Sequence, residues 1–227
     1  MIRCHHGLGD TLQFIRYAPL VRARARRVLV APQPELVPLI GMVPGVDALV
    51  AEGDPLEFGH RSATDSASGL VEVEVMELPY VFRTTLDTIP ATVPYLHVES
   101  GKRGSAGTQR LAVGLVWRAG AWQPERSIDV RLLAPLANIP GVEIHVLQRN
   151  ARREELRTLW RGGGRDERNA GNVIDSSTPN VLELARLIRS LDLVIGVDTM
   201  VIHLAGALGV PVWAMLRARA DWRWMDG

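Results

Sequence analysis

Apolar and polar positions alternate along the chain in two series, each of which combines short apolar runs with segments of helical spacing. Short apolar runs favour strands, and apolar residues that recur at helical intervals favour helices. In the first series the expected strands are residues 2–5, 28–31, 46–50 and 70–75, and the expected helices are residues 11–26 and 35–42. Pro19 is expected to bend or break the first helix, because proline lacks the amide hydrogen that a helix interior needs.

A polar stretch rich in glycine and serine, residues 100–109, follows the first series and is typical of a linker. In the second series the expected strands are residues 111–117, 142–147, 173–175, 193–197 and 210–215, and the expected helices are residues 130–138, 151–160, 180–190 and 199–208. Two further segments, residues 52–69 and 161–172, are expected to be loops.

Strands that alternate with helices favour parallel sheets covered by helices on both faces. Two such series joined by a linker predict two doubly wound α/β domains, residues 1–103 and 104–227. In such domains the carboxyl ends of strands and the amino ends of helices meet at one edge, where ligands bind. The sequence therefore predicts a ligand cleft between the two domains.

The composition excludes several classes of protein. Of the 227 residues, 47% are hydrophobic and 22% are charged, which is typical of a globular chain with a sizeable core. The net charge of +1 gives no electrostatic reason to expect nucleic-acid binding. The single cysteine, Cys4, excludes an internal disulfide framework and a multi-cysteine metal site. The sequence has neither a signal peptide nor a long uncharged apolar stretch, so we expect a soluble, cytoplasmic protein.

The first candidate site is the segment HHGLGD at 5–10, between a strand and a helix. Glycines at such a turn let the backbone approach a ligand closely, and Asp10 is expected at the start of the helix. Asp10 is also explained as a simple helix N-cap. Leu12 replaces the third glycine of a dinucleotide fingerprint, so a nicotinamide cofactor is disfavoured. The adjacent His5 and His6 are expected to point to opposite faces, which disfavours a metal site.

The second candidate site lies where the strand 193–197 ends at Asp198 and a helix begins at Thr199. The first amide groups of a helix have no partner within it, and together with the Thr199 hydroxyl they can bind an anion. Asp198 and Thr199 are also explained as simple caps, and His203 as a core histidine with one hydrogen bond.

The third candidate site is the loop after the strand 111–117, which contains Arg118 and Arg126. Arginine binds phosphate with two parallel hydrogen bonds, although two solvated loop arginines explain the same pattern. Residues 147–150 either line the cleft or form a plain loop. The segment DWRW at 221–224 is dense in tryptophan, which is normally packed against other groups.

These motifs carry a resemblance to a known family. The matching stretches are GLGDTLQFIRYAPLV at 7–21, PGVDALV at 44–50, FRTTLDTIPATVPYL at 82–96, VGLVWRAG at 113–120, RSIDVRLLAPL at 126–136, LDLVIGVDTMVIHLAGALGVPVW at 191–213 and DWRW at 221–224. The chain resembles the family 9 glycosyltransferases, the heptosyltransferase-like group with two Rossmann-like domains (the GT-B fold). Within this group it is most similar to the catalytic domain that follows tetratricopeptide repeats in bacteria.

The resemblance implies an inverting, metal-independent transfer of a sugar from a nucleotide-diphosphate sugar, with an ADP-linked donor favoured and no cofactor. The implied acceptor is a glycan of the lipopolysaccharide type, a lipid-linked glycan or a protein, and peripheral contact with the inner face of the cytoplasmic membrane is compatible with it. Carried over by position, Asp10 is the general base. The acceptor-side loop contains Gly7, Gly9 and Gln13, and the residues implied in donor and diphosphate binding are Arg118, Arg126, Asp198, Thr199, Met200, Val201 and His203.

The chain departs from the family pattern at three points. Met200 stands where glycine or alanine is usual, and the loop that contains Arg126 lacks the lysine of the heptosyltransferases. The chain also ends just after DWRW, so we expect a second domain that is truncated at its C-terminus. These departures keep two alternatives open, namely a non-catalytic nucleotide-binding or scaffold module and a nucleotide-sugar epimerase or hydrolase.

Overall fold

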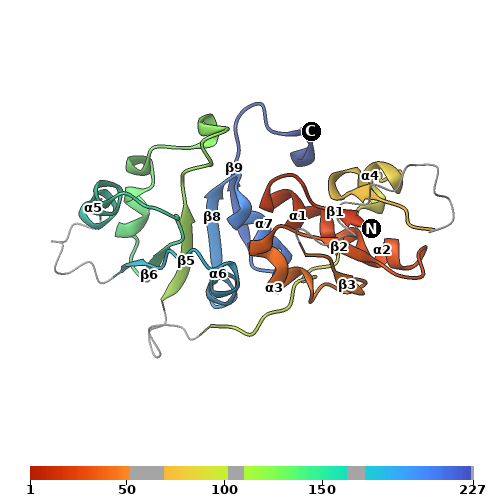
Figure 1. The fold of residues 1–227 in the computed structure, drawn as a ribbon. Helices are drawn as coiled ribbons and strands as arrows, with labels where there is room; N and C mark the ends of the chain where they lie inside the picture. The colour runs from red at the N-terminus through yellow and green to blue at the C-terminus, as the bar shows by residue number, and fades with distance from the viewer. Residues whose placement is uncertain (52–68, 102–109, 163–171, 226–227) are drawn as a thin grey trace. The chain divides into compact units, whose positions relative to one another are not determined.

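The computed structural model describes residues 1–51, 69–101, 110–162 and 172–225. The chain divides into two compact units, Met1–His97 and Val98–Gly227, each with its own sheet (Figure 1). The predicted boundary after residue 103, most of the predicted linker, and most of the predicted loops 52–69 and 161–172 lie outside the described residues.

The first unit contains a parallel sheet of short strands in the order β3-β2-β1-β4. The strands are β1 (Ile2–Arg3), β2 (Leu29–Ala31), β3 (Ala48–Leu49) and β4 (Val73–Glu74). The helices are α1 (Leu8–Phe14), α2 (Ala18–Arg22), α3 (Val37–Ile40) and α4 (Leu78–Val81). The prediction of parallel α/β structure from the apolar pattern is confirmed here, with shorter elements than expected.

The long helix expected at 11–26 is broken, as Pro19 predicted. The α-helix α1 gives way to a 3₁₀ turn, Ile15–Tyr17, before α2 begins. Pro19 lies in the first turn of α2, where a missing amide hydrogen leaves no hydrogen bond unmade. The buried residues of this stretch are Thr11, Leu12, Phe14, Ile15, Tyr17 and Ala18.

The second unit contains a parallel five-stranded sheet in the order β7-β6-β5-β8-β9. Its strands are β5 (Leu111–Val116), β6 (Val142–Val146), β7 (Val173–Asp175), β8 (Leu193–Val197) and β9 (Val212–Met215). From β5 the chain builds outward through β6 to β7, and it then returns to add β8 and β9 on the other side. The order therefore reverses between β5 and β8, which is the point where open α/β sheets bind ligands.

The helices of the second unit are α5 (Arg153–Gly162), α6 (Val181–Ile188) and α7 (Met200–Ala207). Helix α5 contacts β7, whereas α7 contacts β8 and β9, and α6 contacts α7 (Figure 1). The helix expected at 130–138 is wrong: the structure has two 3₁₀ turns, Val130–Leu132 and Ala134–Asn138, with Pro135 at the start of the second. Pro135 fits the first turn of a helix but not its interior.

Close packing of β8 against β5 depends on Gly196. A Cβ atom there would lie 2.3 Å from Cγ1 of Val116 and 3.1 Å from Cγ2 of Ile202. Helix α7 packs over the same region with almost every side chain buried, as expected for a helix that is apolar all round. Among the described residues, no helix has the length and apolar character needed to span a membrane.

Candidate functional site

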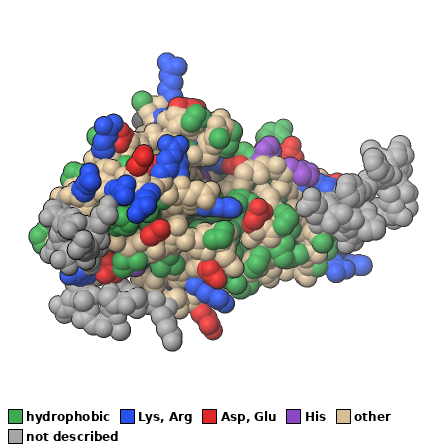
Figure 2. Space-filling view, turned by 60° about the vertical axis from the view of Figure 1, so that its left-hand side comes forward, with side chains coloured by type: hydrophobic (Ala, Val, Ile, Leu, Met, Phe, Trp, Pro, Cys, Tyr) green, Lys and Arg blue, Asp and Glu red, His purple; other side chains and the backbone are tan. Residues whose placement is uncertain are grey.

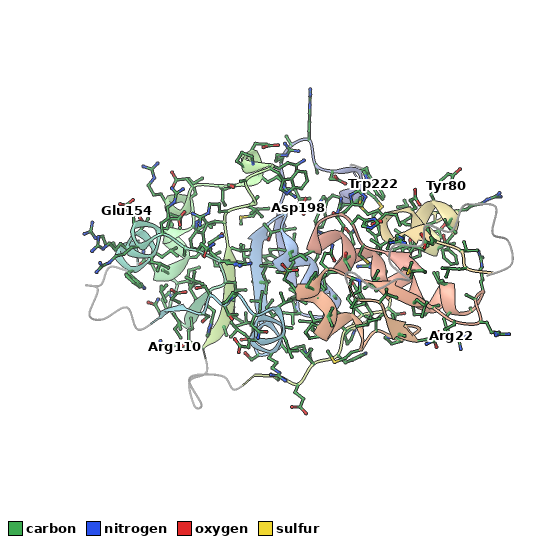
Figure 3. All side chains as sticks on the ribbon, in the orientation of Figure 1. Arg22, Tyr80, Arg110, Glu154, Asp198 and Trp222 are labelled. Atoms are coloured by element: carbon green, nitrogen blue, oxygen red, sulfur yellow. The ribbon has the colours of Figure 1, made fainter. Side chains whose placement is uncertain are left out.

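Two of the predicted site segments meet at the carboxyl edge of the second sheet. Strands β5 and β8 are neighbours, with Val116 opposite Gly196. The loop that contains Arg126 therefore leaves the sheet next to the turn that contains Asp198 and Thr199. Figure 3 shows Asp198 at this end of β8. The sheet topology thus explains why residues 72 positions apart in sequence (126 and 198) form one cluster.

Asp198 is the centre of this cluster. Its Oδ1 atom lies 3.2 Å from Nε2 of His203, and its Oδ2 atom lies 3.2 Å from Nε1 of Trp224 and 3.3 Å from Nη1 of Arg126. Burial alone would raise the pKa of Asp198, but the hydrogen bonds from His203 and Trp224 and the positive charge of Arg126 outweigh it and lower the pKa to about 2. An ionised carboxylate only accepts hydrogen bonds, so Nε2 of His203 donates.

His203 and Trp224 are stacked on one another. Their ring centroids are 5.4 Å apart, and the ring planes are inclined by 25°. Trp224 ends the 3₁₀ turn Trp222–Trp224, whose N-cap Asp221 accepts a hydrogen bond from the amide of Arg223. The prediction that a tryptophan of the DWRW segment packs against other groups is confirmed for Trp224. The interpretation of His203 as a buried histidine with one hydrogen bond also fits, since only 9% of the residue is exposed.

Arg126 ends the 3₁₀ turn Pro124–Arg126 in the loop after β5. Its guanidinium lies over the ring of Trp122, 4.9 Å from the centroid, in addition to its ion pair with Asp198. The Nε atom is buried and has no hydrogen-bond partner among the described residues. Arg126 is therefore held in place by an anion and an aromatic ring while part of its donor capacity is unused.

Thr199 has the second unpartnered polar atom of the cluster. It occupies the N-cap position of α7, but its hydroxyl makes no capping hydrogen bond and, within the described part of the chain, has no partner although it is buried. The interpretation of Thr199 as a cap is therefore confirmed in position, but its hydroxyl is not used for capping. The amides of Met200 and Val201 belong to the first turn and have no partner within the helix. Buried polar atoms without partners are rare in proteins and indicate a missing ligand or water.

A pocket of about 360 Å³, including its opening to solvent, lies beside these groups within the second unit. The residues that line it are Gln123, Arg126, Asp198, Met215, Leu216, Arg217, Ala220, Asp221 and Trp224. Arg217 pairs with Glu125 at 3.0 Å, which connects the segment after β9 to the loop after β5. Two of the lining residues, Arg126 and Arg217, are arginines, so the pocket offers positive charge to a ligand.

Arg118 lies elsewhere and does not line the pocket. Its Nη1 atom is 2.8 Å and 2.9 Å from the two carboxylate oxygens of Glu155 on α5, and its Nη2 atom donates to the carbonyl of Asn150. Glu155 accepts further hydrogen bonds from the Trp117 indole and the Arg152 amide. Burial would raise the pKa of Glu155, but these donors and the charge of Arg118 lower it. Of the two loop arginines, the structure places only Arg126 beside Asp198.

The segment 147–150 supports the loop. The side chain of Gln148 is buried, and its Oε1 atom accepts from the backbone amides of Trp117 and Arg118 at 3.2 Å and 2.8 Å. The side chain of Val201 is buried and that of Met200 is partly exposed, and neither side chain lines the pocket.

In the first unit, Asp10 is the third residue of α1, and the N-cap is Gly7. The interpretation of Asp10 as the N-cap is therefore wrong in position, although its Oδ2 atom does accept from the amide of Gly7 at 2.9 Å. A Cβ atom on Gly7 would lie 3.2 Å from that oxygen, so glycine allows the carboxylate to approach. Asp10, Gly9 and Gln13 are partly exposed.

The loop before α1 is anchored by two side chains. His5 pairs with Glu74 at 3.0 Å, and the carbonyl of His6 accepts from Gln33 at 2.8 Å. No cluster of three or more metal-ligating side chains occurs in the ranges that the structure describes. Asp10 and Thr199 belong to different units, and their predicted apposition stays a prediction.

Sequence reasoning missed the contact between Trp224 and Asp198, the participation of Arg217 and the supporting role of Gln148. The signals in the sequence were the DWRW segment at 221–224, which the resemblance included without a role, and the polar residues at 147–150, for which a plain loop was an equal alternative. Figure 2 shows basic and acidic side chains interspersed on the visible face, consistent with the net charge of +1.

Comparisons with known proteins point to one family. The family model described as glycosyltransferase family 9 (heptosyltransferase) matches residues 177–224, a segment that contains Asp198, Thr199, His203 and Trp224. No curated protein matches the sequence.

Three solved structures show the likeness of the fold. Heptosyltransferase II of E. coli is 13% identical with a TM-score of 0.63, and the match covers 94% of this chain and 83% of that one. A family 9 glycosyl transferase from Veillonella parvula is 14% identical with a TM-score of 0.64, and the match covers 94% and 80%. The E. coli heptosyltransferase WaaC with ADP-2-deoxy-2-fluoro heptose is 13% identical with a TM-score of 0.52, and the match covers 97% and 90%. The predicted resemblance is therefore confirmed: the chain has the two-unit α/β fold of the heptosyltransferases and is similar to family 9 glycosyltransferases.

Proposed function

We propose that the chain is an inverting glycosyltransferase that transfers a sugar from a nucleoside-diphosphate sugar, with ADP as the favoured nucleotide, to the hydroxyl of a glycan acceptor. The fold and the matched segment support sugar transfer in general. The observation that carries the proposal is a pair of buried polar atoms without partners among the described residues, Nε of Arg126 and Oγ1 of Thr199. Arg126 lines the pocket, and Thr199 directly follows Asp198, which also lines it.

These groups suit a diphosphate. The guanidinium of Arg126, the Thr199 hydroxyl and the first amides of α7 are all hydrogen-bond donors, and the helix dipole adds positive potential at the same end. A nucleoside diphosphate leaves readily only if its growing negative charge is stabilised, and donors fixed in a partly buried site do this effectively. The proposal needs no metal ion, because arginine and the amino end of α7 supply the positive potential.

Asp198 has a supporting role in this scheme. Oδ1 accepts one hydrogen bond, from His203, so that oxygen keeps capacity for a hydroxyl group of the donor sugar. Its negative charge is balanced by Arg126, and the indole N–H of Trp224 donates a hydrogen bond to it. The carboxylate can therefore remain ionised next to a diphosphate without leaving an uncompensated buried charge.

Asp10 is proposed as the general base. Its carboxylate takes the proton of the acceptor hydroxyl while that oxygen forms a bond to the anomeric carbon. The bond from the anomeric carbon to the diphosphate oxygen breaks, and the nucleoside diphosphate leaves with the electron pair. Such proton transfer contributes typically about 10²–10⁴-fold to a rate. One displacement from the opposite face inverts the anomeric centre.

The test starts with binding. Isothermal titration of the purified chain with ADP, GDP, UDP and inorganic pyrophosphate is expected to show saturable binding, tightest for ADP. Arg126→Ala is expected to weaken binding roughly 10- to 100-fold, the range for loss of hydrogen bonds to a charged group. Arg131→Ala is the matched control, because Arg131 is a surface residue that pairs with Asp129. A folded protein that binds none of these ligands would overturn the proposal.

Turnover distinguishes transfer from the alternatives. Mass spectrometry of reactions with ADP-sugars is expected to show an acceptor that has gained one sugar and a stoichiometric amount of ADP. Release of ADP at the same rate without any acceptor would indicate a hydrolase instead. Conversion of the donor sugar with its diphosphate bond intact would indicate an epimerase.

A further inference from the structure

Three segments of the second unit meet at the Asp198 carboxylate. Arg126 comes from the loop after β5, His203 from α7, and Trp224 from the 3₁₀ turn that follows β9. Trp224 and Arg126 approach the same oxygen, Oδ2, at 3.2 Å and 3.3 Å. The orientation of the arginine is therefore linked to the position of the tryptophan through one atom.

Trp224 is held in two directions. Stacking on His203 fixes the plane of its ring, and the hydrogen bond to Asp198 fixes the edge that carries the indole nitrogen. Both partners are more than nine-tenths buried, and Trp224 itself lines the pocket. The side chain is thus fixed between the carboxylate and the pocket, although it has no charge to offer a diphosphate.

We infer that Trp224 is a positioning residue of the diphosphate site, which shares the Asp198 carboxylate with Arg126 and so keeps the guanidinium available to the ligand. This inference rests on the proposed function, because it takes a nucleoside diphosphate as the occupant of the pocket. Without the indole N–H, Arg126 is the only donor to Oδ2 in the part of the chain that the structure describes. The carboxylate then draws the guanidinium toward itself and away from the ligand, and the pocket loses positive potential.

For Asp198→Asn, the positioning role and simple charge counting predict opposite changes in affinity. Asp198→Asn removes a negative charge close to a bound diphosphate, so Coulomb repulsion alone predicts tighter binding. The positioning role predicts weaker binding, because asparagine has one acceptor oxygen in place of two. Its NH₂ group then faces either the donor of His203 or the donors of Trp224 and Arg126, so the three side chains are no longer all held.

The experiment measures Kd for ADP and for inorganic pyrophosphate with wild type, Trp224→Phe, Asp198→Asn, Arg126→Ala and the double variant Trp224→Phe/Arg126→Ala. Trp224→Phe keeps a ring that can stack on His203 and removes only the donor. Trp213→Phe is the matched control, because Trp213 is 65% exposed and does not line the pocket. Circular dichroism and thermal unfolding establish that each variant is folded at the temperature of the titration.

Trp224→Phe is expected to weaken the binding of ADP and of pyrophosphate equally, by roughly 2- to 10-fold, which is less than the effect of Arg126→Ala because Trp224 acts only through Arg126. The effect is expected to disappear in the Arg126→Ala background, because Trp224 acts through Arg126. A residue with only a structural role would lower Tm and leave both Kd values unchanged. If Trp224→Phe does not fold, the direction in which Asp198→Asn changes Kd for ADP tests the inference: weaker binding supports the positioning role, and tighter binding overturns it.

The outcomes separate this inference from the proposed function. If wild type binds ADP and pyrophosphate but Trp224→Phe binds them equally well, the positioning role is overturned and the proposed function stands. The same holds if the effects of Trp224→Phe and Arg126→Ala simply add. If wild type binds neither ligand, the proposed function is overturned and the inference with it.

Discussion

Gln148 accepts a hydrogen bond from the backbone amide of Arg118 at 2.8 Å, and a second from the adjacent amide of Trp117 at 3.2 Å. Gln148 follows β6 and the two amides follow β5, so one side chain ties the carboxyl ends of neighbouring strands together. The loop that reaches Arg126 begins at this point. Its starting direction is therefore set by a buried amide side chain that does not itself line the pocket.

Gln148→Leu is expected to destabilise the second unit. The substitution is close in volume but leaves two amides without an acceptor, and unsatisfied buried donors cost about 1–3 kcal/mol each. Urea unfolding followed by circular dichroism measures the change in free energy. Arg149→Leu, at the neighbouring exposed position, is the control and is expected to change it by less than about 0.5 kcal/mol. Equal stability of the two variants would contradict the anchoring role.

Gly196→Ala is expected to disturb the packing of β8 against β5 next to the Asp198 cluster. The new methyl group would lie 2.3 Å from Cγ1 of Val116, so β5 and β8 must separate at the end that carries the cluster. Overpacking of this kind costs typically about 1–3 kcal/mol. Val116→Ala removes the clashing atom, so the double variant is expected to recover part of the lost stability and ADP affinity. Additive losses in the double variant would show that the clash is not the cause.

The environment of Asp198 predicts how stability depends on pH. Its pKa is about 2 in the folded chain, below the ordinary aspartate value of 3.8 that applies once the chain unfolds, so the folded state favours the ionised form. The resulting stabilisation, about 2 kcal/mol, is present above pH 4 and is lost as pH falls through the interval between these two pKa values. Urea unfolding at pH 6 and at pH 2.5 is expected to show a larger stability gap between wild type and Asp198→Asn at pH 6. A gap that is independent of pH would contradict this.

Arg118→Ala is expected to affect mainly stability, and Arg126→Ala is expected to affect mainly ADP binding. Arg118→Ala breaks a partly buried pair and leaves Glu155 without its cation, so the free energy of unfolding is expected to fall by about 1–3 kcal/mol. Its Kd for ADP is expected to stay within about twofold of wild type. Arg126→Ala is expected to weaken ADP binding with a smaller loss of stability. A loss of ADP affinity in Arg118→Ala that matches Arg126→Ala would restore both arginines to the diphosphate site.

The sequence predicted the parts of the site that depend on local pattern. A continuous apolar run followed by Asp198 and Thr199 marked a buried strand leading into a helix, and both elements are present. The partners of Asp198 depend instead on which strands are adjacent and on where the chain returns after β9. The position of Trp224 is set by that return, and Arg118 finds Glu155 because α5 packs beside the loop. The apolar and polar pattern along the chain indicates neither the contact of Trp224 with Asp198 nor that of Arg118 with Glu155.

The errors at the helices also have physical reasons. Apolar spacing at 130–138 matches a helix, but Pro135 removes an interior hydrogen bond and the segment forms 3₁₀ turns. At α1 the helix begins earlier than expected, because Gly7 serves as the N-cap and the Asp10 side chain satisfies its amide from within the first turn. Asp10 therefore has a structural contact as well as a proposed chemical role, and the two are separable.

Asp10→Asn is the substitution that separates them. Asparagine keeps a side-chain oxygen that can accept from the Gly7 amide, so the free energy of unfolding is expected to stay within about 1 kcal/mol of wild type. It cannot take the acceptor's proton, so kcat is expected to fall about 10²–10⁴-fold while Kd for ADP is unchanged. Asp87→Asn, another first-turn carboxylate of the same unit, is the control and is expected to keep full turnover. If Asp10→Asn transfers sugar at the wild-type rate, Asp10 is a helix-capping residue alone and the base lies elsewhere.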